Sequence, residues 1–574
     1  MYVAIVQNNP TVGALRANAA QVLETLDALA ASAYPPDLVV LPSCALTGAP
    51  LDGLCHSDAF MAEALDVARL FMEKAPLPTL VGTLLPVPLE EGAGFIGEPE
   101  VLFCRDGEGT PLGFIDPPGQ WEPLRYTSSV TVSLDGQTVS VLLDGPPEPT
   151  DDFTASDIVI VMLAKEYQGT DTMFTASDQL GYLREVARRN DAWVLAVNLV
   201  GAQDDVVYDG ASVALAPDGS VVEAAGPFVE QVLSFNIGLE RRPGNEEGRL
   251  VRPLLPYDAD WRALGLCIHD YVRKNGFTDV VIGLSGGIDS AVTAALACDA
   301  LGAGHVHGVL MPGPYSSEGS VLDATALAAN LGIETLSLPI DGPLAAFSAL
   351  YREVLGQEGS FLARQNIQAR IRAVHLMQLS NTFGWLLLNT GNKSEAAMGF
   401  STLYGDTAGA LAPLGNTYKT DVYGLAHWRN GRSPVIPVEI LEKAPSAELY
   451  EGQKDQDSLP PYEVLDRILG LHIEDGLGVD QILEYSRQVP DGTALTEDLV
   501  ATVLDTVRRA EFKRRQEPLA PVLGTLDMGI DRDWPITNGF TDHSRGLVPD
   551  GRPEEYLEMV RGWKRPEGWG FLAN

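Results

Sequence analysis

The feature that most constrains this chain is the stretch VVIGLSGGIDSAV at residues 280–292. A β-rich apolar run ends in a glycine pair, and an Asp-Ser pair then leads into an alanine-rich run typical of a helix. Glycines after a strand let backbone N–H groups approach a ligand closely, and the positive end of the following helix attracts anions. The pattern therefore predicts an anion-binding loop. Its residues are Gly283, Leu284, Ser285, Gly286, Gly287, Ile288, Asp289 and Ser290.

Asp289 is the unusual member of this loop, because a carboxylate repels a bound phosphate unless a cation lies between them. Mg²⁺ prefers carboxylate and phosphate oxygens together, so a magnesium ion is expected here. The loop is not the G-x-x-x-x-G-K-[ST] phosphate loop, since no lysine follows the glycines. A plain turn with a capping Asp or Ser is the alternative. The position between a strand-like run and a helix-like run favours ligand binding.

Charge and composition exclude several classes of protein. The 574 residues include 39 basic and 78 acidic side chains, a formal net charge of −39, which disfavours nucleic acid as a partner. No apolar run reaches the roughly 18 residues of a membrane span. The five cysteines have no paired spacing, which is typical of a reducing compartment, so a cytoplasmic location is expected.

Lysines are few and unevenly placed. Only nine occur, and five of them lie between positions 390 and 515. In so acidic a chain, such clustering indicates a phosphate site in the second half, although chance is the alternative. The five lysines are Lys393, Lys419, Lys443, Lys454 and Lys513.

The order of apolar and polar segments predicts two domains. Residues 1–237 alternate strand-like and helix-like runs, as in a layered α/β domain. Residues 238–258 are polar and rich in Gly and Pro, which is typical of a linker. In residues 259–574, a helix from Trp261 precedes a βαβ series, which predicts a parallel sheet with ligands at the carboxyl ends of its strands. The region from Pro445 onward is expected to be rich in loops, Pro and charged residues.

The glycine loop resembles the pyrophosphate loop of the ATP-pyrophosphatase superfamily. Further stretches follow in order: HGVLMPGPYSSEGSVLDA, QNIQARIRAV, LLLNTGNKSEAAMGFSTLYGD, PLGNTYKTDVYGLA and EFKRRQ. Together they resemble the synthetase domain of NAD⁺ synthetases over about residues 245–545. The resemblance implies a Rossmann-like parallel-sheet domain. It also implies a reaction in which deamido-NAD⁺, ATP and ammonia give NAD⁺, AMP and pyrophosphate through an adenylate.

The same resemblance implies roles for individual residues. Asp289 and Glu395 would hold Mg²⁺, and with Lys419 they would form the catalytic group. Besides the glycine loop, the residues expected to bind ATP are Met311, Arg370, Thr390 and Lys419. The residues expected to bind deamido-NAD⁺ are Asn366, Glu395, Asp406 and Lys513.

Each of these side chains also has an ordinary structural explanation. Glu395 could simply begin a helix, where its charge suits the helix dipole. Lys419 could be a surface lysine, and Asp406 could form a turn. Arg370 and Arg372 could be ion-pairing residues of a helix.

The first half resembles the nitrilase-like glutaminase domain, an αββα sandwich, in VAIVQNNPTVGALRANAAQVLETL and PPDLVVLPSCALTGAPLDGL. That domain uses a Glu base, a Lys and a Cys nucleophile. Ser43 stands where the Glu belongs, and Asp144 stands at about the Cys position. No lysine occurs at positions 75–164 and no cysteine at positions 105–266. The thiolate and its base are therefore missing, and we expect the enzyme to use ammonia.

Four alternative functions remain open from the sequence, and one oligomeric state is expected. The nitrogen could come from glutamine, either through an unrecognised site on this chain or through a separate glutaminase docked on it. The superfamily also includes enzymes that adenylate a nucleobase or a tRNA base. A non-enzymatic assembly protein is the most remote reading. The resemblance further implies a homo-oligomer, at least a dimer.

Overall fold

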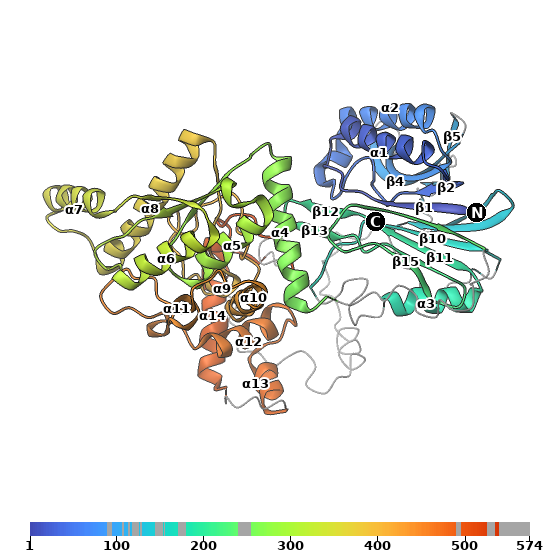
Figure 1. Cartoon of the computed structure of the whole chain (residues 1–574). Helices are drawn as coiled ribbons and strands as arrows, with labels where there is room; N and C mark the ends of the chain where they lie inside the picture. Colours follow the sequence, from blue (N-terminus) through green and yellow to red (C-terminus); the bar gives the residue numbers. More distant parts are fainter. Residues whose placement is uncertain are drawn as a thin grey trace, which may run out of the picture.

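The protein divides into two halves on either side of the long helix α4 (Pro256–Lys274), as Figure 1 shows. The structure is a computed structural model. It describes residues 1–88, 95–105, 108–112, 115–116, 125–126, 129–143, 153, 155–169, 179–238, 254–488, 495–524 and 534–538. Asp144, expected at the position of the missing nucleophile, lies outside these residues.

Two six-stranded sheets stack face to face in the N-terminal half. The first sheet has the order β16 (Gln231–Asn236), β1 (Tyr2–Gln7), β2 (Leu38–Val40), β3 (Thr79–Pro88), β4 (Phe95–Arg105), β5 (Glu108–Pro111). The second has the order β15 (Val221–Ala224), β14 (Val213–Leu215), β11 (Trp193–Asn198), β10 (Ile158–Leu163), β9 (Gln137–Leu143), β8 (Ser129–Leu134). A small separate pair joins β6 (Ile115–Asp116) to β7 (Arg125–Tyr126).

Helices cover both outer faces of this pair of sheets. Helices α1 (Leu15–Ala30) and α2 (Asp58–Lys74) pack on the first sheet, and α3 (Gln179–Asn190) packs on the second. In β1, Val3 and Ile5 enter the core between the sheets, whereas Ala4 and Val6 face the helices. Because both faces of the strand are covered, it reads as one apolar run. The expected αββα sandwich is confirmed.

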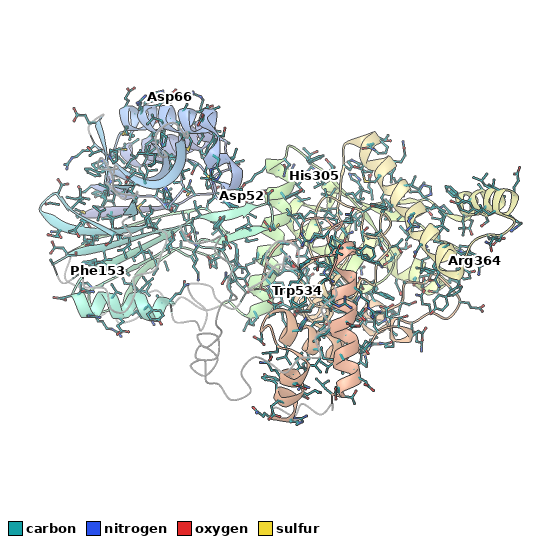
Figure 2. All side chains as sticks on the ribbon, turned by 180° about the vertical axis from the view of Figure 1, so that it is seen from behind. Asp52, Asp66, Phe153, His305, Arg364 and Trp534 are labelled. Atoms are coloured by element: carbon teal, nitrogen blue, oxygen red, sulfur yellow. The ribbon has the colours of Figure 1, made fainter. Side chains whose placement is uncertain are left out.

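A hairpin leaves this sandwich and reaches α4. It consists of β12 (Val200–Gln203) and β13 (Val206–Asp209), joined by a turn at Asp204 and Asp205. Figure 2 shows the sandwich from behind, with Asp66 on α2 and Phe153 at opposite sides of the stacked sheets.

The second half is built on a parallel sheet of order β19-β18-β17-β20. Its strands are β17 (Val280–Gly283), β18 (Val306–Leu310), β19 (Glu334–Ser337) and β20 (Leu386–Leu387). One face packs on α5 (Ile288–Leu301) and α6 (Glu318–Leu331), and α4, α10 (Lys419–Arg432) and α11 (Val438–Glu442) pack on α5 in the same core. The other face packs on α8 (Phe361–Phe383), which follows α7 (Asp341–Leu355). The predicted parallel-sheet domain is confirmed.

Two features differ from the sequence-based expectations: the start of one helix and the content of the last region. The helix expected from Trp261 begins at Pro256, because proline is well suited to the first turn, where no N–H partner is needed. The region after Pro445 holds more than loops. It contains α12 (Tyr462–Ile473), α13 (Val479–Gln488) and α14 (Glu497–Arg514), which pack with α9 (Lys393–Met398) around a core of their own. The expectation of a region rich in loops missed these helices, although apolar residues recur there at helical spacing.

Among the described residues, no helix combines the length and the apolar character that crossing a lipid bilayer requires.

Candidate active site

A cavity of about 560 Å³ lies at the carboxyl ends of the parallel strands. The loop after β17 and the loop after β20 both line it. These two strands are neighbours in the sheet, but the chain leaves β17 toward β18 on one side and reaches β20 only after crossing to the other. Such a reversal of strand order is where open α/β sheets bind ligands.

The glycine loop forms one wall of this cavity. Gly286 has φ +78°, and a Cβ there would lie 2.2 Å from the carbonyl oxygen of Ser320. Only glycine fits, because the loop backbone lies directly against the start of α6. The loop is held from inside by Ser285 Oγ, which accepts from Gly287 N at 3.1 Å, and by Ser290 Oγ, which donates to Gly287 O at 3.1 Å.

Helix α5 begins at Ile288 without a side-chain cap. Its first N–H groups therefore have no side-chain acceptor, and they point with the positive end of the helix dipole toward the glycine loop. All eight residues of the predicted loop line the cavity. The loop and the helix end can bind an anionic group such as a phosphate.

Lys419 joins the two carboxylates that the sequence analysis singled out. Its Nζ lies 2.5 Å from Asp289 Oδ2 and 3.1 Å from Glu395 Oε1, and its side chain is only 2% exposed. Asn392 Nδ2 donates to the other oxygen of Asp289 at 2.9 Å. The same Asn392 caps α9 by accepting from the backbone N–H of Glu395 at 3.0 Å. Residues more than a hundred positions apart thus meet in one cluster.

The electrostatics of this cluster follow from its burial. Burial tends to lower the pKa of Lys419, but the carboxylates of Asp289 and Glu395 outweigh it and raise that pKa above its usual value. Burial raises the pKa of Glu395 to about 7, and the charge of Asp289 adds to the rise while Lys419 opposes it. Two carboxylates share one lysine, so the cluster keeps an excess of negative charge that suits a further cation.

Met311, Thr390 and Asp406 also line the cavity, as expected. Asp406 is buried, which raises the pKa of its carboxyl, and it accepts a hydrogen bond from Thr402 N at 2.5 Å. It therefore shapes the turn and also lines the cavity, and its contact with deamido-NAD⁺ stays a prediction.

Three predicted residues do not line the cavity but hold the loop at residues 399–406 that does. Asn366 Oδ1 accepts from Thr402 Oγ1 at 3.1 Å. Arg370 Nε donates to Leu403 O at 3.1 Å. Lys513 Nζ donates to Gly399 O and Ser401 O at 2.6 and 2.7 Å. Their direct contact with a nucleotide stays a prediction.

Arg372 lines the cavity, and the sequence analysis gave it no functional role. Its Nε donates to Met311 O at 3.1 Å, and burial lowers its pKa although Glu448 and Asp406 raise it. The signal was in the sequence: Ala369, Arg372, Ala373 and Leu376 all line the cavity at helical spacing, and Arg370 falls off that face.

Lys443 also lines the cavity, although no individual contact was expected of it. Its Nζ donates to Gly286 O at 3.3 Å and to Ser320 Oγ at 3.2 Å, and it pairs with Asp323. It belongs to the lysine group noted above. Of that group, Lys419 and Lys443 line the cavity, whereas Lys393 is buried against Glu474. The predicted cationic site thus has two lysines from this group.

Comparison with known proteins identifies the family. Residues 260–517 match the NAD synthase family model. Two relatives named glutamine-dependent NAD(+) synthetase come from Aquifex aeolicus and Rhodobacter capsulatus. They are 34% and 37% identical, over 93% and 94% of this chain and 99% of each relative. The structure of the glutamine-dependent NAD⁺ synthetase from Acinetobacter baumannii in complex with ADP has a TM-score of 0.65 and 28% identity, over 95% of this chain and 99% of that one. The enzyme of that name from Cytophaga hutchinsonii shares the fold, with a TM-score of 0.76 at 17% identity over 94% of this chain and 98% of that one. The chain belongs to the family of glutamine-dependent NAD⁺ synthetases.

Proposed function

We propose that this NAD⁺ synthetase, an ATP-using ligase, amidates deamido-NAD⁺ with ammonia and not with nitrogen that it releases from glutamine. The observation that carries this proposal is the set of residues at the three glutaminase positions. Ser43 replaces the Glu base, and the intervals that should contain the Lys and the Cys contain neither. Ser43 is buried shortly after β2, and its Oγ donates a hydrogen bond to Cys44 Sγ at 3.7 Å.

Three of the five cysteines are poorly suited to replace the missing nucleophile. None of the five forms a disulfide. Burial raises the pKa of Cys104 and of Cys298 to about 12, and burial also raises that of Cys267. A thiol with a raised pKa stays protonated at neutral pH and is a poor nucleophile. These observations support a nitrogen source outside the chain, either free ammonia or a separate glutaminase.

We assign the amidation to the cavity of the second half. The backbone N–H groups of the glycine loop bind the phosphates of ATP, and Lys419 offsets their charge. A carboxylate oxygen of deamido-NAD⁺ attacks the α-phosphorus, the bond to the bridging oxygen breaks, and pyrophosphate leaves. Ammonia then attacks the acyl carbon, AMP leaves with the former carboxylate oxygen, and one proton is released. Positioning and charge stabilisation provide the rate.

Asp289 and Glu395 fit Mg²⁺, because hard cations prefer one or two carboxylates together with phosphate oxygens. Their oxygens lie around one lysine Nζ, within 2.5 and 3.1 Å of it. The ion would neutralise charge on the departing pyrophosphate. Lys419 would then stay near the same phosphates.

We also propose a homo-oligomer, at least a dimer. Helix α7 has no buried residue, and it projects from the body of the molecule in Figure 1. Together with the start of α8 it exposes large apolar side chains, which soluble monomers seldom gather on one surface. They are Leu350, Val354, Leu355, Phe361 and Leu362. Light scattering of the purified chain tests this, and a monomer at micromolar concentration would contradict it.

The test of the main proposal is NAD⁺ formation from deamido-NAD⁺, ATP and Mg²⁺, with ammonium or glutamine as the nitrogen source. Asp289→Ala, purified in the same way, controls for contaminating synthetase. We expect full activity with ammonium and background activity with glutamine, unless a separate glutaminase is added. An equal or higher rate with glutamine, in a preparation free of glutaminase, would overturn the proposal.

A further inference from the structure

We propose that the N-terminal half is a working part of the synthetase site, because it holds one wall of the cavity in position through residues 518–524, here called the strap. The proposal rests on the cavity being the site of NAD⁺ synthesis. It does not depend on the nitrogen donor. It gives the N-terminal half a task that needs no glutaminase chemistry.

The strap extends the parallel sheet of the second half. Leu388, directly after β20, bridges in parallel to Leu411, and Leu411 bridges in parallel to Leu519 of the strap. Ala412 N donates to Leu519 O at 2.8 Å, and Asn416 Nδ2 donates to Ala520 O at 3.1 Å. Leu519 and Ala520 line the cavity. On this side, the strap is a structural element of the synthetase site.

The other side of the strap contacts the N-terminal half. Val522 N donates to the carbonyl oxygen of Asp205, in the turn of the β12–β13 hairpin, at 2.8 Å. Gly169 follows β10 and approaches the strap so closely that a Cβ there would lie 2.8 Å from Leu523 O. Leu523 is buried in a core shared by Tyr167 of the first half and by α4. Asp205 itself lines the synthetase cavity.

The hairpin that carries Asp205 is held firmly against α4. Asp270 on α4 is 2% exposed, and its Oδ2 accepts from Ala202 N and from Asn9 Nδ2, both at 2.8 Å. Lys274, one turn further along, donates to Ala202 O at 3.0 Å and to Asn9 Oδ1 at 2.7 Å. A charged pair on α4 thus fixes two separate segments of the N-terminal half. The hairpin is therefore a rigid support for the strap.

A displacement of the strap would be transmitted to the catalytic cluster through a short series of contacts. The strap holds residues 411–416, and α10 begins three residues later at Lys419. Thr417 O also accepts from Lys393 N at 2.9 Å, at the start of the helix that carries Glu395. Displacing the strap would thus displace Lys419 and Glu395 relative to the glycine loop. A misplacement on the order of 1 Å costs about a hundredfold in rate.

Two glycine variants test this in the full-length chain. Gly169→Ala introduces a methyl group against Leu523 O at a residue with φ +57°. Gly136→Ala is the matched control, because it has φ +82° in the same half but no atom within 4 Å of the new Cβ. Both carry the backbone strain of a left-handed alanine. Only the first pushes on the strap.

The readouts are the Kd for ATP and the kcat and KM with whichever nitrogen source supports turnover of the wild type. We expect Gly169→Ala to lower kcat about tenfold or more and to weaken ATP binding several-fold, within the range that misplacement produces. A smaller folded fraction alone would lower kcat and leave both the Kd and the KM for ATP unchanged. Gly136→Ala should stay within about twofold of the wild type, as a remote surface change does.

Val522→Pro provides an independent perturbation, since it removes the N–H that bonds Asp205 O without adding bulk at Gly169. It should also weaken ATP binding. If Gly169→Ala and Val522→Pro both bind ATP and turn over like Gly136→Ala, the proposal is overturned. A wild type that binds ATP but forms no NAD⁺ with ammonium would count against the proposed function, whereas the effect of the strap on the Kd for ATP would still decide the inference.

Discussion

Replacing Lys419 by methionine is the most informative single substitution in the catalytic cluster. The Nζ lies 2.5 and 3.1 Å from two carboxylates, and the side chain is 2% exposed. At an effective dielectric constant of about 20, each contact is worth roughly 5–7 kcal/mol of Coulomb energy. Desolvation of the charged groups offsets most of this attraction. The net loss of stability therefore depends on how the carboxylates of Asp289 and Glu395 respond to the loss of the lysine charge.

The carboxylates can relieve the lost charge by taking up one proton. Burial already raises the pKa of Glu395 to about 7 in the wild type, so this proton is taken up at little cost near pH 7. The loss then comes mainly from the contact of Lys419 with Asp289, and hydration from the adjoining cavity reduces it. We expect the free energy of unfolding to fall by about 2–4 kcal/mol at pH 7, near or somewhat below the roughly 3–5 kcal/mol that breaking a buried ion pair usually costs.

The pH dependence has a definite sign. Lys419 is one of the groups that lowers the pKa of Glu395, so its removal raises that pKa further above the value in the unfolded chain. The wild type loses the Glu395 proton as the pH rises through about 7, whereas the folded variant keeps it to higher pH. The variant therefore loses stability more steeply above about pH 7, and its deficit relative to the wild type should be larger at pH 7.5 than at pH 5.5.

Urea unfolding of the metal-free protein at pH 5.5 and pH 7.5 measures this deficit. Lys454→Met is the control, because Lys454 is exposed and its loss should change stability by no more than about 0.5 kcal/mol. A deficit below about 1 kcal/mol, or one that is equal at both pH values, would refute the view that Lys419 balances two buried carboxylates.

The other predictions concern the rest of the cavity wall. Arg372→Met should raise the KM for ATP about tenfold or more in steady-state assays, because it removes a charged donor from the cavity wall. Arg370→Met should change the KM by less than about threefold, because Arg370 donates to Leu403 O outside the cavity lining. Gly286→Ala should abolish ATP binding in calorimetry, since its Cβ would collide with Ser320 O at 2.2 Å; ordinary binding would show that the loop is not the ATP site. Asp289→Asn should shift the Mg²⁺ dependence of activity to at least about tenfold higher concentration, by loss of an ionised ligand, and an unchanged midpoint would remove Asp289 from the metal site.

Sequence reasoning worked best where the site is local. The glycine loop could be predicted because a strand, a glycine pair and a helix start are contiguous, and all eight of its residues line the cavity. Lys419 and Glu395 came from the family resemblance, and their distances to one another could not be read from spacing. Arg372 could have been found by following the helical period from Ala369 to Leu376, instead of weighing Arg370 and Arg372 together.

Contacts between residues far apart in the sequence could not be predicted from local patterns. Nothing local marks Asp205 as a wall residue of the synthetase cavity, since it meets Val522 more than three hundred positions away. The helices between 462 and 514 were missed because charge and proline content outweighed a clear apolar period, seen in Val500, Val503 and Val507. Hairpin, strap and α4 form one shared core only when the chain is folded.

The origin of the nitrogen in the product shows directly whether the enzyme uses ammonia or glutamine. Purified protein is given deamido-NAD⁺, ATP and Mg²⁺ with equal concentrations of ¹⁵N-ammonium and unlabelled glutamine, and the NAD⁺ is analysed by mass spectrometry. Because Ser43 stands at the position of the missing base and no lysine occurs at 75–164, we predict that nearly all of the NAD⁺ carries ¹⁵N. NAD⁺ that is mostly unlabelled, in a preparation that contains no other glutaminase, would contradict it.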